Sequence, residues 1–287
     1  MAGAQPHRGA GAGGRRLSGG LSRLAAAEAG LKPRGMKHSA IRIGLAGFLV
    51  LASRVWAVDA ALLEKAKAGE VEAQIKVGIA YADGEGEGAK DPAEAARWFL
   101  KAAQQGHPYA QYRIGDMCLT GQGVAKNIAS TMHWWRKSAD QGFVLGEFNL
   151  GVAYASGITG EANPAEAARW FRKAADQGYA PAQGNLGNAY YFGQGVAKDG
   201  AEAVKWWTKA AEQGDPTAQN NLGLVYAKAT GVPRDFVRAL AWWRLAAENG
   251  SQQAKTSIPT VEPLMNEAQL AEAAKLVVEL RQKIKRP

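Results

Sequence analysis

A pattern of apolar residues and glycines repeats five times along the chain. In each copy a glycine follows an apolar residue, an aromatic pair comes next, and a second glycine closes the copy. The aromatic pairs and the closing glycines recur every 36 residues. The first two opening glycines are 37 apart, which places one inserted residue in the loop near 84–88. A period of this length is typical of a solenoid whose units stack on one another. The opening glycines are Gly78, Gly115, Gly151, Gly187 and Gly223, the pairs begin at Trp98, Trp134, Trp170, Trp206 and Trp242, and the closing glycines are Gly106, Gly142, Gly178, Gly214 and Gly250.

Each copy predicts two helices. The first runs from about residue 110 to 119 in the second copy, where Ile114 and Cys118 are four residues apart and share one helical face. A glycine inside a helix costs about 1 kcal/mol relative to alanine, so its recurrence predicts a partner helix that packs too closely for a Cβ atom. The first aromatic residue of each pair is expected to pack between helices, and the second to be partly exposed.

The second helix of each copy has clear end signals. An Asp or Asn residue precedes each one, and its side-chain oxygen can accept a hydrogen bond from a free N–H group of the first turn. Pro92 and Pro164 fit the first helical position, where the missing N–H group has no consequence. The closing glycine fits the position after the helix, where a left-handed residue ends it. The five N-cap residues are Asp91, Asn127, Asn163, Asp199 and Asp235.

The repeat pattern extends beyond the five copies at both ends. Residues 59–67 resemble a lone second helix, and residues 266–285 form an amphipathic pattern with apolar positions three and four apart. A solenoid needs such terminal elements to cover its end faces. We expect one domain over 58–287, with a half-repeat at 58–72, five repeats over about 73–253 and a capping helix at 264–287.

The positive charge of the chain belongs to its N-terminal leader. The formal net charge is +9, but residues 1–57 contain nine basic groups and one acid, which leaves 26 basic and 25 acidic groups in 58–287. The repeats therefore give no electrostatic reason to expect a nucleic-acid partner.

The second part of the leader has the order of a secretory signal peptide. Met36 opens a short basic segment, an apolar core follows at 43–52, and small residues precede a cleavage position after Ala57. We expect export to the periplasm or the medium, and no stable membrane insertion after cleavage, because the core is shorter than the about 20 residues that span a bilayer. An uncleaved anchor is the alternative. Residues 1–35 are expected to be disordered or not to be translated at all. Because the signal begins at Met36, the start codon at residue 1 would then be assigned too far upstream. A transit peptide in residues 1–35 is the alternative.

The residues of the repeats offer little catalytic chemistry. Cys118 is the single cysteine, so no internal disulfide can form, and we expect it to be a buried helix residue. After residue 57 the chain contains two histidines, His107 and His133, in no metal-ligand or nucleophile motif. We expect no enzyme activity, no metal and no cofactor.

The repeat unit resembles the Sel-one-like repeat, a relative of the tetratricopeptide repeats. The resemblance covers residues 73–253 and implies a fold: an all-α, right-handed superhelical solenoid of antiparallel helix pairs. It also implies an adaptor role, often at bacterial cell surfaces or in the periplasm. The third copy departs from the pattern at Gly146 and in the loop 157–160, and the fifth at Ala229. The family's cysteine-rich, disulfide-linked branch has been associated with β-lactam binding, but with one cysteine this chain departs from it. The unit is clearest in Ala182-Gln183, Leu186-Gly187, Tyr190, Gly193-Gln194-Gly195-Val196, Asp199, Ala203, Trp206, Lys209-Ala210-Ala211 and Gly214.

The resemblance also implies where a partner would bind. By analogy with tetratricopeptide units, the concave face is lined by first-helix positions three before and one after the opening glycine. Aromatic residues at or near these positions are candidate anchors, and a group of asparagines could bind an extended peptide backbone. We expect a protein or peptide partner and a monomeric chain. A secreted factor that binds host proteins, and less so a hydrolase or peptidoglycan-binding protein, are the alternatives. The candidate residues are Tyr112, Asp116, Phe148, Asn185, Asn188, Tyr191, Asn220 and Asn221.

Overall fold

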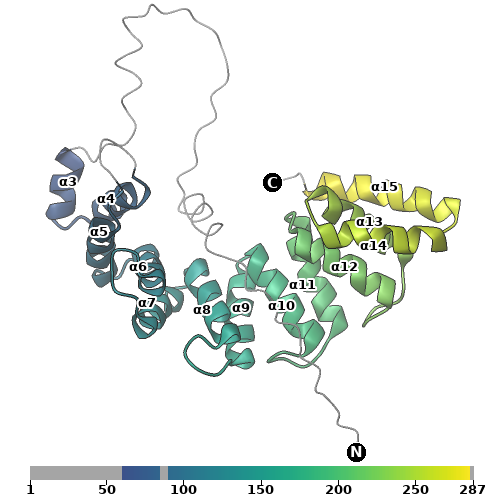
Figure 1. Cartoon of the computed structure of the whole chain (residues 1–287), viewed down its shortest axis with the longest axis horizontal. Helices are drawn as coiled ribbons and strands as arrows, with labels where there is room; N and C mark the ends of the chain where they lie inside the picture. The colour runs from purple at the N-terminus through teal and green to yellow at the C-terminus, as the bar shows by residue number, and fades with distance from the viewer. Residues whose placement is uncertain (1–59, 85–89, 285–287) are drawn as a thin grey trace, which may run out of the picture. The chain divides into compact units, whose positions relative to one another are not determined.

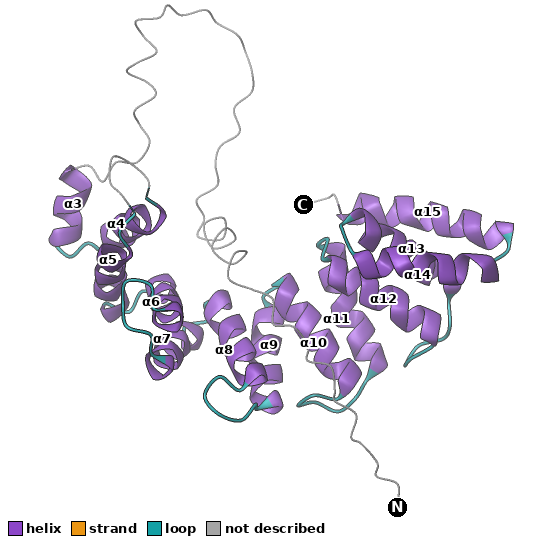
Figure 2. Ribbon diagram, viewed as in Figure 1, coloured by secondary structure: helices purple, strands orange, loops and turns teal. Residues whose placement is uncertain are grey.

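The computed structural model describes residues 60–84 and 90–284, and these residues form helices joined by short turns, with no strand among them (Figures 1 and 2). The leader at 1–35, the signal peptide at 36–57 with its cleavage after Ala57, and the insertion in the 84–88 loop lie outside this range, apart from Gly84. The helices are α3 (Ala60–Lys67), α4 (Val71–Asp83), α5 (Pro92–Gln104), α6 (Pro108–Thr120), α7 (Ile128–Asp140), α8 (Val144–Ser156), α9 (Pro164–Asp176), α10 (Ala180–Phe192), α11 (Gly200–Glu212), α12 (Pro216–Lys228), α13 (Phe236–Glu248), α14 (Gln252–Val261) and α15 (Glu267–Ile284), with a 3-10 turn at Glu262–Leu264.

Each helix from α3 to α14 packs mainly against the helices next to it in the chain, which is the contact pattern of a solenoid. The first helices of the five repeats are α4, α6, α8, α10 and α12, and the second helices are α5, α7, α9, α11 and α13. The predicted all-α solenoid of helix pairs is confirmed.

The opening glycine of each repeat lies against the second aromatic residue of the pair. A Cβ atom at Gly115 or Gly187 would lie 2.5 Å from the Cδ1 atom of Trp135 or Trp207, which is inside van der Waals contact. The predicted close approach of the two helices is therefore confirmed. The expectation that the second aromatic residue is partly exposed is wrong, because this packing buries all five. The partly exposed member is instead Trp134, the first of its pair.

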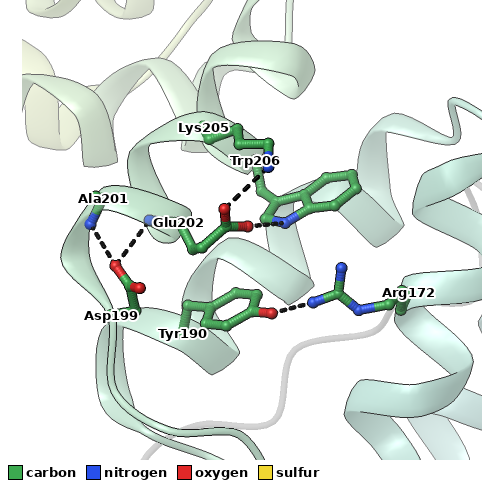
Figure 3. A network of polar contacts seen from close by, with 7 residues as sticks. All are labelled: Arg172, Tyr190, Asp199, Ala201, Glu202, Lys205 and Trp206. Atoms are coloured by element: carbon green, nitrogen blue, oxygen red, sulfur yellow. Dashed lines mark hydrogen bonds and ion pairs between the residues drawn. The ribbon is translucent and has the colours of Figure 1, made fainter.

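The helix ends follow the predicted chemistry. All five predicted N-cap side chains accept hydrogen bonds from backbone N–H groups of the first turn, as Asp199 does from Ala201 at 2.9 Å and Glu202 at 3.0 Å (Figure 3). The five closing glycines have φ between 77° and 96°, a left-handed conformation that glycine adopts without steric penalty. The first helices end in the same conformation, and in the fifth repeat Ala229 adopts it with φ of 56°.

A ladder of buried glutamines joins successive repeats. Gln111 on α6 donates to the carbonyl oxygen of Ala103 on α5 at 3.2 Å, and its Oε1 accepts from Gln141 at the end of α7 at 2.8 Å. Gln74, Gln183 and Gln219 make the equivalent contacts. In the third repeat Glu147 takes this place and accepts from Gln177 at 2.7 Å. Burial raises the pKa of the Glu147 carboxyl, and an ionised carboxylate has no proton to donate to the preceding repeat.

A second inter-repeat contact lies on the other side of each junction. Arg172 on α9 donates to the hydroxyl of Tyr190 on α10, and its guanidinium lies 5.5 Å from the centre of the Trp206 ring on α11 (Figure 3). Arg136 makes the same contacts with Tyr154 and Trp170. At the other two junctions between repeats another residue stands in place of this arginine. Leu100 precedes a repeat with Cys118 in place of the tyrosine, whereas Thr208 precedes a repeat that keeps Tyr226. The Tyr226 hydroxyl accepts instead from Arg238 on α13 at 3.4 Å.

Gly146 stands at the start of the third repeat where the other repeats have alanine, and it accommodates a substitution in the second repeat. Ser138 replaces an alanine found at the equivalent place of the other second helices, and its hydroxyl donates to the carbonyl oxygen of Pro108 at 2.8 Å. A Cβ atom at Gly146 would lie 2.7 Å from this Oγ atom. Glycine is needed there because the serine fills the space.

An additional helix covers each end of the array, α3 with 8 residues and α15 with 18. At the N-terminal end α3 packs on α4, and Ala66 lies in a buried cluster with Val77 and Trp98. At the C-terminal end α15 packs along α13 and reaches α11, with Val277 and Leu280 buried. Among the described residues, the helices are too short or too polar to cross a membrane.

Candidate protein-binding surface

The first helices meet side by side, and their side chains bond from one repeat to the next. Asn149 on α8 donates to Asp116 on α6 at 3.0 Å, and Asn221 on α12 donates to Asn188 on α10 at 3.1 Å. We use the name first-helix surface for eight residues on α6, α8, α10 and α12, of which seven are partly exposed and Phe192 is exposed. Its members are Asp116, Val152, Asn185, Asn188, Tyr191, Phe192, Asn220 and Asn221.

Tyr112 and Phe148, two of the predicted aromatic anchors, are not part of this surface. Tyr112 is 2% exposed and Phe148 is 9% exposed, so the expectation that they are open to a partner is wrong. The residue just before the next first helix packs on each of them: Phe143 lies 5.7 Å from Tyr112 between ring centres, and Tyr179 lies 5.1 Å from Phe148. These rings instead hold neighbouring repeats together.

Asp116 is the centre of a polar cluster between the second and third repeats. Its Oδ1 accepts from the indole nitrogen of Trp135 and from the amide of Asn149, both at 3.0 Å, and the hydroxyl of Tyr112 also bonds the carboxylate. Burial raises the pKa of Asp116 to about 6, although these hydrogen bonds act in the opposite direction. At neutral pH the group is an ionised carboxylate held in a partly dry place.

Asn188 forms the same cluster two repeats later. Its Oδ1 accepts from the indole nitrogen of Trp207 at 3.2 Å and from the amide of Asn221 at 3.1 Å. In the first and third repeats the residue at this position is apolar, and phenylalanine replaces the tryptophan. A buried indole N–H group needs an acceptor, and in the fifth repeat, where Leu224 stands at this position, the Trp243 indole donates instead to the backbone carbonyl of Asn220.

Asn185 lies between the two clusters without a bonding partner. It stands at the position of Asn149 and Asn221, whose amides reach back to the preceding first helix. The residue that would accept its hydrogen bond is Val152, which has no polar side-chain atom. The Asn185 carboxamide therefore makes no hydrogen bond to any described residue, and it is partly exposed.

Tyr191 and Phe192 form an aromatic pair at the end of α10. Their ring centres are 4.9 Å apart in an edge-on arrangement, and Tyr191 also lies 5.3 Å from Trp207. Phe192 is 63% exposed. Sequence reasoning missed it, although a signal existed, since the equivalent positions in the other four repeats are polar. Those residues are Asp83, Thr120, Ser156 and Lys228.

Asn220, the last predicted residue, lies beside this group on α12. Its backbone carbonyl accepts from the Trp243 indole at 3.2 Å, whereas its side-chain Oδ1 is covered and has no hydrogen-bond partner among the described residues. The structure thus brings Asn185, Asn188, Tyr191, Asn220 and Asn221 together on α10 and α12, and places Asp116 two repeats away.

The described residues hold little that suggests chemistry. No group of three or more histidine, cysteine, aspartate or glutamate side chains among them could hold a metal ion. Cys118 is buried, and burial raises the pKa of its thiol, so the reactive thiolate is disfavoured. His133 packs edge-on against Trp134, 5.1 Å away.

Comparisons with known proteins agree with the repeat pattern. The Sel1 repeat model matches residues 71–107, 108–143, 144–179, 180–215 and 216–251. A Sel1 repeat protein from Oxalobacter formigenes is 32% identical and has a TM-score of 0.62, over 76% of this chain and 86% of that one. The protein c5321, a protective antigen of uropathogenic Escherichia coli with an SLR fold, is 30% identical with a TM-score of 0.51, over 78% of this chain and 56% of that one. No curated protein matches the sequence.

Proposed function

Because the chain belongs to the Sel1 repeat family, whose members typically mediate protein–protein interactions and are generally non-catalytic, we propose that it holds an extended segment of a protein partner on the first-helix surface. The Asn185 carboxamide carries the proposal. The neighbouring amides at this position are bonded within the protein, whereas Asn185 has both a donor and an acceptor to offer. A peptide backbone presents the complementary N–H and C=O groups.

The exposed ring of Phe192 supports the same surface. A large apolar side chain that is 63% exposed, next to Tyr191, is an aromatic anchor of the kind that contributes much of the binding energy at interfaces. Asn188 adds an amide nitrogen that bonds no described residue. Polar groups that fix a backbone beside an aromatic pair suit a peptide segment with an apolar side chain.

Photo-crosslinking tests the surface. We would place a photoreactive amino acid at Phe192 in the full chain and, as a matched control, at Gln104, an exposed residue at the end of a second helix. A partner should crosslink from position 192 and not from 104. Asn185→Ala should reduce the crosslink about tenfold, the equivalent of one hydrogen bond of about 1.4 kcal/mol. It should leave the thermal midpoint unchanged, because the side chain bonds no described residue. Equal yields from both positions would contradict the proposal.

We also propose that the chain acts outside the cytoplasm, on the strength of the signal-peptide pattern at 36–57. N-terminal sequencing of the protein recovered from its source cells should begin at Val58. A mature protein that begins upstream of Met36 would contradict the export proposal.

A further inference from the structure

The two polar clusters of the first-helix surface differ in one group. Asp116 and Asn188 both use Oδ1 to accept an indole N–H and an amide N–H. What remains for a ligand at Asn188 is a neutral amide donor. At Asp116 three donors face a carboxylate that has about four acceptor sites, so an anionic acceptor remains.

The negative charge of Asp116 has no ion-pair partner among the described residues. The nearest basic residue on its helix is Arg113, whose Nη1 donates to the Tyr109 hydroxyl at 2.6 Å. The same guanidinium lies 4.6 Å from the centre of the Phe99 ring, a cation–π contact that directs it to the preceding repeat. Burial raises the pKa of Asp116 to about 6, although the positive charge of Arg113 and the hydrogen bonds to the carboxylate act in the opposite direction, so the negative charge is only partly compensated. An incoming cation would supply the missing compensation.

The distance along the surface fits a short stretch of extended chain. Helices in contact lie about 8–10 Å apart, so α6 and α10, two first helices apart, are separated by roughly 20 Å. An extended chain covers about 3.4 Å per residue and spans this distance with about six residues. Asn185 and Phe192 lie on the same helix, α10.

We propose that the segment held on this surface carries a lysine or arginine opposite Asp116 and, about six residues away, a large apolar side chain on Tyr191 and Phe192. The proposal rests on the proposed function, since it specifies the chemistry of the segment that the first-helix surface binds. The charge gives the site its preference for a basic residue, and the aromatic pair sets the position of the apolar one.

A random dodecapeptide display library, selected on the immobilised full chain at pH 7.5, tests this chemistry. The enriched peptides should share a basic residue and a large apolar residue about six positions apart. A synthetic peptide of this kind should bind Asp116→Asn about tenfold more weakly, as expected for a lost charged hydrogen bond. Asn already stands at the equivalent position 188, so this variant keeps the two Oδ1 contacts. Replacing the peptide's basic residue with glutamine should produce the same loss, and Asp116→Asn should then have no further effect.

The outcomes separate this inference from the proposed function. One result is that the selected peptides bind Asn185→Ala more weakly and yet contain no preferred basic residue and bind Asp116→Asn as tightly as wild type. This result would overturn the inference and leave the surface assignment in place. Failure to select any peptide sensitive to Asn185→Ala would overturn both. Phe192→Ser provides the second arm, since it should remove the apolar preference while the basic preference stays.

Discussion

Asp116→Asn should stabilise the protein at neutral pH. Burial raises the pKa of Asp116 from 3.8 to about 6, so the folded protein binds this proton more tightly than the unfolded chain. The wild-type free energy of unfolding therefore falls as pH rises from about 4 to 6, and the loss persists above pH 6. A difference of roughly two pKa units at about 1.4 kcal/mol each gives at most about 3 kcal/mol at pH 7.5.

Asparagine removes the charge and keeps the oxygen that Trp135 and Asn149 bond, and its amide nitrogen can donate to the Tyr112 hydroxyl, which donates to the carboxylate in the wild type. Urea unfolding of both proteins, followed by circular dichroism, should show the variant more stable at pH 7.5 and the difference largely gone at pH 4. Titration of Glu147 and other carboxylates is common to both proteins and cancels in the difference. Asn188→Asp is the reverse control, and it should destabilise the protein at pH 7.5.

Two results would refute this reasoning. If the variant is less stable than wild type at pH 7.5, the hydrogen bonds to the ionised carboxylate stabilise the fold by more than the burial of its charge destabilises it. A stability difference of the same size at pH 4 and pH 7.5 would assign the effect to packing rather than charge.

Four further substitutions test the repeat geometry. Gly187→Ala should lower the free energy of unfolding by about 1–3 kcal/mol, because its Cβ would lie 2.5 Å from the Trp207 ring. Gly78→Ala should lower it by less in the same thermal unfolding experiment, because its Cβ would lie 3.0 Å from the neighbouring ring. Ala229→Gly should raise the free energy of unfolding by about 1 kcal/mol, because glycine adopts the left-handed conformation without strain, and a lower thermal midpoint would contradict this. Glu147→Gln should stabilise the protein by about 1 kcal/mol at pH 7.5 and less in acid, since burial raises the carboxyl pKa and glutamine restores the donor; equal stability at all pH values would exclude this.

The features predicted correctly from the sequence are those whose cause lies close by in the chain. An N-cap such as Asp199 bonds backbone groups two and three residues later, and Gly187 faces an aromatic residue at a fixed offset in its own repeat. Because the N-cap residue and the glycine–aromatic pair recur in all five repeats, a chance pattern is excluded and the structural role of each residue can be inferred from the sequence.

The candidate surface was predicted less well because exposure depends on the next repeat. Tyr112 is buried by Phe143, a residue that varies between repeats and that no periodic rule places over it. The unbonded carboxamide of Asn185 could not be predicted, because it depends on a contact between repeats in which Asn149 bonds Asp116, 33 residues earlier. Phe192 was available from the sequence, as an aromatic residue where other repeats are polar, but helical position alone did not indicate its exposure.

The glutamine ladder has a mechanical consequence. Where each repeat touches its neighbours and little else, resistance to pulling is set by the weakest junction rather than by the average one. Glu147 lacks the donor that the other repeats direct to the preceding carbonyl, so the joint between the second and third repeats depends on other contacts. These are the Asn149–Asp116 and Arg136–Tyr154 hydrogen bonds and the ring contact of Phe143 with Tyr112. If these contacts are lost under tension applied at the two ends, the array parts there and leaves one block on either side of the break. The two polar clusters would then separate differently: Asp116 loses its bond to Asn149 as the joint opens, whereas Asn188 and Asn221 stay bonded within one block.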